Sequence, residues 1–424
     1  MQRSQDIIFM SKNVGALALH GGTPIRSLPM PKRMLLGEQE REIVLKMLDD
    51  AIQSGDAIRY NEKYEHEYQL RFTDFMGGGY ADCVNSGTNA FFSALGALNI
   101  KHGSEVIIPA ITDVGGVSPV FFHSLVPVMA DVDKRTYNTC AHEIEKVITK
   151  KTRAIVVTHV AGEPVEMGPI MDLANKYNLY VIEDCAQSHG AEYCGKKVGS
   201  IGDISFFSTM PGKHHCTGGQ GGVVFSNNNE LIIKSKMLAD RGKVFQGDEF
   251  TGEYSIAGLN CNMDELSAAI GCVQIQKLPD IIKSTNNIGE YIKRELAQNS
   301  MVASVGWQPD NSKNVYWFIR IKIDFENISV DKETFVKALL AEGIPVSAEY
   351  RSTPFSQPWY RKTLEVSTYI ADDRKREIIE QLSYTNVEYV LDGHINVFIR
   401  ENYGDKEVND ILSAIRKVEH AYVV

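Results

Sequence analysis

Short apolar runs alternate with longer helical stretches through the middle of the chain. The apolar runs are Glu105–Pro109, Leu125–Ala130, Arg153–Thr158 and Leu179–Glu183. Runs of this length, rich in Val and Ile and bounded by polar or turn residues, are typical of buried parallel strands. The stretch Pro169–Tyr177, which leads into a turn at Asn178, has a helical pattern. This alternation predicts an α/β protein whose parallel sheet is covered on both faces, with ligands bound at the carboxyl ends of the strands.

The pattern changes after about Lys277. We expect a long helix at Asp280–Gln298 and a half-buried strand at Tyr316–Ile323. A second helix is expected from Asp331, and a last strand at His394–Ile399. Strands that face helices on one side indicate a smaller α+β domain. A chain of 424 residues is also long for one core. We therefore predict a large domain at residues 1–277, with the N-terminal segment included, and a small C-terminal domain at residues 278–424.

Composition and charge narrow the possible partners. Hydrophobic residues make up 43% of the chain and charged residues 23%, which argues against disorder. The net charge of −10 argues against broad nucleic-acid binding, which needs clustered Lys and Arg. A small molecule that carries a phosphate remains possible, because a local nest of N–H groups can bind it.

The cysteines and the N-terminus indicate a cytoplasmic protein. Seven cysteines are present, an odd number, and none are spaced as CxxC, which argues against a disulfide framework and against a metal site. The start of the chain, MQRSQDIIFMSKN, lacks an apolar stretch long enough for a signal peptide. No run approaches the roughly 18 apolar residues of a membrane span.

A turn of small residues opens a helix at Ser86–Ala90 (SGTNA), between a strand-like ADCVN and a helical AFFSALGAL. The free N–H groups and the positive dipole at such a helix start suit a phosphate. An ordinary N-cap explains the same residues, because Ser and Thr favour that position without any ligand.

An acidic residue ends a very apolar strand in Ile182–Gly190 (IEDCAQSHG). Asp184 is thus well placed for a ligand site, although a helix N-cap is an alternative explanation. Further on, Lys213 follows the strand-like Gly202–Ser208 (GDISFFS). A desolvated lysine has a lowered pKa and becomes a nucleophile, whereas an ordinary loop lysine is solvated. The glycine-rich Thr217–Gly222 fits either a ligand approach or a simple turn.

Together and in this order, these four segments resemble the DegT/StrS-like family of sugar aminotransferases. The resemblance extends over most of the chain and includes Leu17–Gly22, Ile107–Ala110, Asp131–Asp133 and Gly258–Gln276. It implies the fold of type I pyridoxal-phosphate (PLP) transferases, with a mostly parallel seven-stranded sheet in the large domain. It also implies a homodimer with both active sites at the interface.

Carried over to this sequence, the resemblance implies a set of cofactor contacts. Lys213 would form the Schiff base and shuttle protons, and Asp184 would hold the pyridine nitrogen. The remaining expected contacts, to the ring hydroxyl and the phosphate, are Gln187, Ser208, Gly87, Thr88 and, across the dimer interface, Asn260. His189 also matches a common family position, but a lone histidine is more often structural and we assign it no chemistry.

Four positions depart from the family pattern. Asp113 stands where an aromatic residue usually stacks on the ring, and Gln220 stands where Glu is usual. The common Asn-Tyr-Arg-Met is Asn260–Met263 (NCNM), so its arginine is missing, and Glu349–Tyr350 replaces a usual His-Tyr.

The register at the lysine leaves two hypotheses open. Some relatives carry His in place of the lysine and are sugar dehydratases, and this chain reads Lys213-His214-His215. When the chain is aligned with the family pattern forward from Gly202, Lys213 falls at the position of the family's lysine. When it is aligned backward from Gly222, His214 falls at that position. We favour the forward count, because strand register is hard to slip and an insertion in the following loop costs little.

The expected function is therefore a PLP-dependent aminotransferase that converts a keto sugar, nucleotide-linked or a cyclitol ketone, to an amino sugar with glutamate or glutamine as donor. The alternative is a dehydratase of the same fold that uses His214. A non-catalytic protein that kept the fold is a third hypothesis. It is disfavoured because such a protein has no need for a lysine, a ring carboxylate and a phosphate cradle together.

Overall fold

The computed structural model describes residues 14–247, 249–348, 350 and 353–424. The N-terminal residues considered for a signal peptide, 1–13, lie outside the described residues, as does Glu349. Among the helices described, none is both long and apolar enough to cross a membrane.

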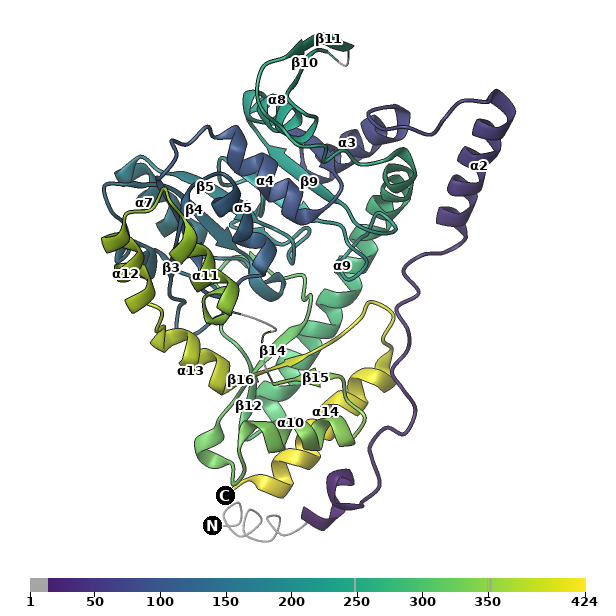
Figure 1. The fold of residues 1–424 in the computed structure, drawn as a ribbon. Helices are drawn as coiled ribbons and strands as arrows, with labels where there is room; N and C mark the ends of the chain where they lie inside the picture. Colours follow the sequence, from purple (N-terminus) through teal and green to yellow (C-terminus); the bar gives the residue numbers. More distant parts are fainter. Residues whose placement is uncertain (1–13, 248, 349, 351–352) are drawn as a thin grey trace.

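A seven-stranded sheet forms the centre of the larger part of the molecule (Figure 1). Its order is β1-β9-β8-β5-β4-β2-β3, and the strands are β1 (Tyr80–Val84), β2 (Glu105–Pro109), β3 (Val126–Ala130), β4 (Thr152–Thr158), β5 (Tyr180–Asp184), β8 (Ile204–Ser208) and β9 (Gly222–Ser226). Strands β3, β2, β4, β5 and β8 pair in parallel, and β9 runs antiparallel to both β8 and β1. The expected mostly parallel seven-stranded sheet and the α/β fold class are confirmed.

Helices cover this sheet, and they bury some of its strands along their whole length. Strands β2 and β3 are buried at every residue. The helices around the sheet and before it are α2 (Glu38–Ser54), α3 (Lys63–Met76), α4 (Gly87–Ala97), α5 (Ser118–Phe122), α6 (Ala141–Glu145), α7 (Met167–Tyr177) and α8 (Asn229–Ala239). Helix α7 ends where the sequence indicates, at Asn178 in the left-handed conformation. Two of the hydrophobic clusters contain alternate residues of β4: Val156 belongs to one and Ile155 to the other.

A second sheet, fully antiparallel, lies in the C-terminal part. Its order is β12-β14-β16-β15, with bounds Ala303–Val305, Ile319–Ile323, His394–Val397 and Val346–Ser347. The helices of this part are α9 (Glu265–Asn299), α10 (Lys332–Ala341), α11 (Pro358–Val366), α12 (Asp372–Glu380), α13 (Thr385–Gly393) and α14 (Asp405–Tyr422). Three short strand pairings complete the fold: β10 (Lys243–Gln246) with β11 (Glu249–Tyr254), β6 (Glu192–Tyr193) with β7 (Lys196–Lys197), and β6 with β13 (Ser312–Lys313).

Two elements of the C-terminal part differ in extent from the prediction. Helix α9 starts at Glu265, before the predicted start at Asp280, because the side chain of Asp264 caps it by accepting from Ser267 N at 2.9 Å. Strand β14 starts at Ile319 and not at Tyr316. The amide of Trp317 instead donates to the carbonyl of Ala161, outside the second sheet, at 2.9 Å.

The domain division at residue 277 stays a prediction. Three features of the structure connect segments on the two sides of that position. Helix α9 runs through this position without a break, from the first sheet to the second (Figure 1). Leu17, from the N-terminal segment, packs in the cluster that contains Ile321 and Ile395 of the second sheet. Helices α11 to α13 contribute buried residues to the cluster of the first sheet, such as Leu364 and Val390.

Candidate active site

Asp184 ends β5, next to the end of β4. The register pairs Asp184 with Thr158, and Oδ2 of Asp184 accepts from the Thr158 hydroxyl at 3.3 Å. Its other oxygen, Oδ1, accepts from the amide of Ala186 at 3.0 Å. The side chain is buried, and this burial raises the pKa of Asp184 to about 6. A buried, fixed carboxylate at a strand end can hold a protonated ring nitrogen.

Gln187 lies one turn further along the same loop and is also buried. Its Oε1 accepts from the amide of Ala161 at 2.9 Å, and its Nε2 donates to the Tyr350 hydroxyl at 2.6 Å. Tyr350 is the tyrosine of Glu349–Tyr350, which stands where the family often has His-Tyr. The described structure thus connects the loop after β5 with the segment that follows β15.

Lys213 lies in the turn that follows β8, and its amide donates to the carbonyl of Met210 at 3.0 Å. Its Nζ lies 4.0 Å from the centre of the Trp317 ring. Burial lowers the pKa of Lys213 to about 8, while the carboxylates of Asp184 and Asp113 act in the opposite direction. A lysine in this state supplies the neutral, nucleophilic amine at mildly alkaline pH.

The turn at Ser86–Thr88 meets the end of β8. Helix α4 begins at Gly87, and its N-cap Ser86 accepts from the amide of Asn89 at 3.1 Å. A Cβ atom on Gly87 would lie 2.6 Å from Cβ of Ser208 and 3.0 Å from its Oγ. The backbone of the turn therefore lies directly against the serine that was predicted to bind phosphate. Amides at the start of an 11-residue helix next to a hydroxyl form a suitable anion cradle.

These residues fit pyridoxal phosphate. A buried carboxylate, a lysine of lowered pKa and a helix start beside a serine hydroxyl all come from loops at the carboxyl ends of β1, β5 and β8. Asp184 and Lys213 also act on each other electrostatically: the carboxylate raises the pKa of the lysine, and the lysine lowers the pKa of the carboxyl group.

The side chain of His214 is held by a hydrogen bond outside this arrangement. The imidazole is buried, and because the carbonyl of Val315 can only accept, Nε2 must donate to it, at 3.2 Å. Burial and then the charge of Arg33 lower the pKa of His214 to about 3. Its ring is therefore neutral and oriented toward the segment before β14.

His189 and His215 also form a structural pair behind the lysine turn. Their Nδ1 atoms are 2.9 Å apart, and Nε2 of His215 lies 2.7 Å from the Tyr68 hydroxyl. Both rings are buried and their pKa values are lowered by that burial. We therefore describe His189 by its contacts and assign it no chemistry.

Asp113 occupies the start of a short 3-10 helix, η3 (Val114–Gly116). Its Oδ1 accepts from the amide of Gly115 at 2.8 Å, and its side chain is exposed. A Cβ atom on Gly116 would lie 3.5 Å from Oδ2 of Asp184, so η3 lies close to the ring carboxylate. Gln220, the other departure in this region, is exposed.

Asn260 lies beside the end of β1, in a loop whose Cys261 carbonyl accepts from the Asn85 amide at 2.8 Å. Its side chain is exposed, and Oδ1 accepts from Nδ2 of Asn262 at 2.7 Å. Within one chain it makes a local contact, so its expected role across a dimer interface stays a prediction.

Two residues near the candidate site were missed in the sequence. Thr158 ends a predicted strand, and the rule that ligands bind at strand ends could have found it. Trp317 approaches Lys213 from the C-terminal part, and its indole Nε1 donates to the Gly212 carbonyl at 2.7 Å. Nothing in the local sequence indicates that long-range contact.

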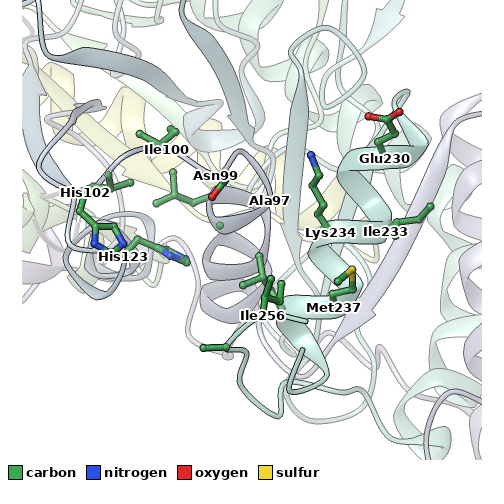
Figure 2. Close-up of a pocket in the computed structure, with 15 residues that line it drawn as sticks. Ala97, Asn99, Ile100, His102, His123, Glu230, Ile233, Lys234, Met237 and Ile256 are labelled. Carbon is green, nitrogen blue, oxygen red and sulfur yellow. The ribbon is translucent and has the colours of Figure 1, made fainter. Parts of the chain in front are cut away.

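A cavity of about 610 Å³ lies apart from these residues, between the end of α4 and helix α8 (Figure 2). Ile233, Lys234 and Met237 of α8 line one side of it, and His123 and Ile256 lie across from them. Asp184, Lys213 and Ser208 are not among its lining residues. The chemistry of the polar side chains, and not cavity size, therefore locates the candidate site.

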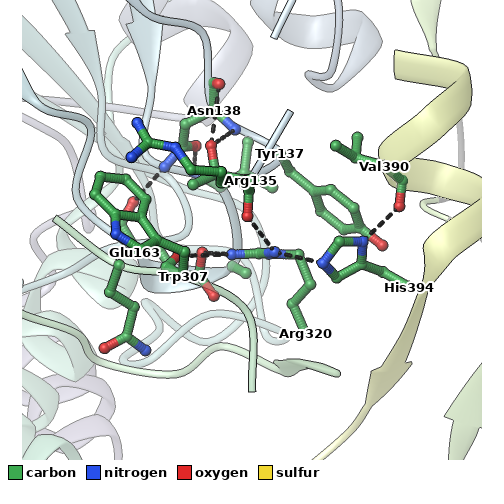
Figure 3. Close-up of polar contacts among 12 residues, drawn as sticks. Arg135, Tyr137, Asn138, Glu163, Trp307, Arg320, Val390 and His394 are labelled. Atoms are coloured by element: carbon green, nitrogen blue, oxygen red, sulfur yellow. Dashed lines mark hydrogen bonds and ion pairs between the residues drawn. The ribbon is translucent and has the colours of Figure 1, made fainter. Parts of the chain in front are cut away.

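A buried arginine connects strand β14 with segments that follow strands of the first sheet (Figure 3). The guanidinium of Arg320, on β14, donates to Glu163 Oε2 at 2.7 Å and to the carbonyls of Arg135 and Trp307 at 3.0 Å. It also donates to Nε2 of His394 at 2.8 Å, and that ring accordingly donates from Nδ1 to the Val390 carbonyl at 2.7 Å. Arg320 is fully buried, so these contacts take the place of water at its two terminal nitrogens.

One cluster has ligand types that could suit a metal ion: His159, Glu183 and Cys185, all buried. Both nitrogens of His159 are engaged, because Nδ1 accepts from the Val165 amide at 2.9 Å and Nε2 lies 3.1 Å from Glu183. Glu183 also accepts from the amides of Gly199, Ile201 and Gly202. His159 and Glu183 thus form a hydrogen-bonded structural contact next to Asp184 in sequence.

Comparison with known proteins gives consistent results. The model of the DegT/DnrJ/EryC1/StrS aminotransferase family matches residues 38–388. An uncharacterised protein of Methanocaldococcus jannaschii is 31% identical over 92% of this chain and 97% of its own. A GDP-perosamine synthase of Escherichia coli O157:H7 is 31% identical over 90% of this chain and all of its own. Among solved structures, an aminotransferase from Psychrobacter cryohalolentis is 27% identical with a TM-score of 0.79, over 91% of this chain and 98% of its own.

Proposed function

Because the chain belongs to the DegT/DnrJ/EryC1/StrS aminotransferase family, as the sequence motifs indicated, we propose that it converts a keto sugar to an amino sugar with pyridoxal phosphate as cofactor. The single observation that carries the proposal is Lys213, whose pKa is lowered by burial and whose amine interacts electrostatically with the carboxylate of Asp184, as suits a reacting amine. Glutamate or glutamine is the proposed donor. The relative named GDP-perosamine synthase supports a nucleotide-linked sugar as substrate, with a cyclitol ketone as the other choice.

The proposed cofactor contacts are divided among three loops. Asp184 would hold the pyridine nitrogen and Gln187 the ring hydroxyl. Ser208, Gly87 and Thr88 would bind the phosphate, with Asn260 of a second subunit completing the site. When bound, pyridoxal phosphate supplies a carbonyl that takes up amines and a ring that delocalises the electron pair left on a substrate carbon.

The chain's own groups move protons around that chemistry. Lys213 Nζ takes the proton from the α-carbon of the donor, which leaves as a 2-oxo acid, and Lys213 later returns a proton to the sugar carbon that receives the amine. Asp184 keeps its partner nitrogen protonated in both halves. Tyr350 holds the amide of Gln187, so that Gln187 Oε1 and Nε2 keep fixed orientations.

A dehydratase that uses His214 is the weaker hypothesis. The His214 ring donates to the carbonyl of Val315, and its pKa is lowered to about 3, so it is a poor base in this position. The two hypotheses differ in the fate of the donor nitrogen, which an aminotransferase transfers to the product.

A homodimer is proposed from the family resemblance and from the Asn260 loop, which would act across the interface. Leu259, directly before Asn260, is 51% exposed. Surface of this kind suits burial by a second copy of the chain. Light scattering should give twice the chain mass, and a monomer that keeps full activity would overturn this part.

The test of the function is a screen of keto sugars with an amino donor labelled with ¹⁵N. Nucleotide-linked 4-keto and 3-keto hexoses and cyclitol ketones should be compared, each with glutamate and glutamine. The proposal predicts ¹⁵N in one product and a 2-oxo acid from the donor. Loss of a hydroxyl from the sugar without transfer of ¹⁵N would contradict it. A cytoplasmic location is proposed from the odd number and the spacing of the cysteines and from the N-terminal sequence.

A further inference from the structure

The turn that carries Lys213 is held by side chains that come from outside the seven-stranded sheet. Three consecutive carbonyls each accept a hydrogen bond: Gly212 O from Trp317 Nε1 at 2.7 Å, Lys213 O from Arg33 Nη1, and His214 O from Arg33 Nη2 at 2.8 Å. The turn lies between β8 and the glycine-rich segment that leads to β9. Because glycines add conformational freedom on one side, these external contacts restrict where the lysine backbone lies.

Arg33 is itself fixed from the C-terminal part. Its Nε donates to both oxygens of Glu401, at 2.8 and 3.0 Å, and the two side chains are only 13% and 18% exposed. Glu401 lies between β16 and α14. The neighbouring Asn402 donates from Nδ2 to the carbonyl of Lys32 at 2.7 Å, which holds the backbone next to Arg33. Figure 1 shows the N-terminal segment passing beside the loop before α14.

We propose that Arg33 is a positioning residue for Lys213: its guanidinium connects Glu401 to the carbonyls of Lys213 and His214 and thereby holds the lysine amine at the cofactor. The inference rests on the proposed function for the role of Lys213. It adds a residue far from the motifs, in the N-terminal segment, that acts on the reacting group through the backbone.

The chemistry of the guanidinium explains why an arginine fits here. Its planar fork donates to two carbonyls and a carboxylate at once, in fixed directions, whereas a lysine ammonium is a point charge on a flexible stem. The protonation state of the nearby His215 is also compatible with a cation. Burial and Arg33 both lower the pKa of His215, so this ring stays neutral beside the guanidinium.

Arg26 offers a matched control in the same segment. It is 9% exposed, and Nη1 forms ion pairs with Glu407 at 3.1 Å and Asp410 at 2.8 Å, both on α14. Like Arg33, it ties the N-terminal segment to the C-terminal part. Its contacts do not include the lysine turn, so it separates a local effect on Lys213 from a general loss of stability.

The first experiment uses cofactor-free protein. Trace acetylation across a pH series, with quantification of the Lys213 peptide by mass spectrometry, gives the pKa of its amine. In Arg33→Ala the loosened turn should admit water, so this pKa should rise by about one unit or more toward its ordinary value. Arg26→Ala should leave it as in the wild type, even if both variants lose similar melting temperature. Arg33→Lys should give an intermediate shift.

The second measurement is the rate at which added pyridoxal phosphate attaches to Lys213, followed by borohydride reduction and peptide mapping. Arg33→Ala should be about 10- to 100-fold slower than Arg26→Ala, because small displacements of a reacting atom cost that much. Equal pKa values and equal attachment rates in the two variants would overturn the inference.

Two further outcomes are decisive. If Arg33→Ala does not fold, Glu401→Gln, which keeps the volume and one acceptor oxygen, should shift the Lys213 pKa in the same direction by less, and an unchanged value would overturn the inference. If wild-type protein forms no adduct at Lys213, the proposed function fails. The pH series in cofactor-free protein then still decides whether Arg33 holds the lysine.

Discussion

The hydroxyl of Thr158 donates to Oδ2 of Asp184 at 3.3 Å, where β4 and β5 end side by side. Thr158 in turn lies 3.1 Å from the hydroxyl of Thr112, in the loop after β2. The candidate ring carboxylate is therefore fixed by neighbouring strands, and this fixed geometry is the basis for the first prediction.

Replacement of Asp184 by Asn should leave the fold nearly intact and reduce turnover by at least about 100-fold. The amide keeps an oxygen that can accept from Ala186, but it cannot stabilise a protonated pyridine nitrogen. Thermal unfolding and single-turnover kinetics should be measured together. Turnover within a few-fold of the wild type would refute the assignment of Asp184.

Gly87→Ala should weaken cofactor binding, because its Cβ would lie 2.6 Å from Cβ of Ser208. Relief of that contact would displace either the helix start or the serine, and both are proposed phosphate contacts. Fluorescence titration should show a dissociation constant raised by about tenfold or more, equivalent to about 1.4 kcal/mol. Gly393→Ala is the control, because a Cβ there meets no atom within 4 Å. Equal affinities in the two variants would refute this cradle.

The buried ion pair of Glu163 and Arg320 should be sensitive to loss of one partner. Arg320→Met alone leaves a buried carboxylate unpaired, and should lower the free energy of unfolding by about 3–5 kcal/mol. Adding Glu163→Gln should recover part of that loss. Urea unfolding of the single and double variants measures the coupling. The exposed pair Lys337–Glu333 is the control, with an expected effect below about 0.5 kcal/mol.

Asp82, on β1, should give stability an opposite pH dependence from that of a paired carboxylate. Burial raises its pKa to about 7, whereas an unfolded aspartate titrates near 4. The folded state thus binds the proton more tightly, so the contribution to stability is present below about pH 4 and lost as pH rises through about 7. The Asp82→Asn variant has no carboxyl group at this position, so it does not lose stability in this way as the pH rises. Its stability relative to wild type should therefore increase between these pH values, by up to about 1.4 kcal/mol per unit, and a constant difference would contradict the argument.

The sequence predicts the parallel strands and the position of Asp184 because both depend on local apolar runs and their ends. The fold class is confirmed by the seven-stranded sheet and the family by the match to the family model, whereas the individual cofactor contacts stay predictions. The features that the local sequence pattern did not predict depend on contacts between distant parts of the chain. Trp317 leaves the predicted strand because its amide pairs with Ala161, and Arg33 reaches Lys213 across 180 positions of sequence. Such contacts form only when separate segments pack together.

The measurement that tests the central claim most directly is the position of the cofactor adduct. Purified protein with pyridoxal phosphate should be reduced with borohydride, digested and mapped, in the wild type, Lys213→Ala and His214→Ala. The account predicts a single stable adduct on Lys213 that persists in His214→Ala and disappears, together with amine transfer, in Lys213→Ala. An adduct on another lysine, or an active enzyme that never forms one, would contradict the account and favour the dehydratase.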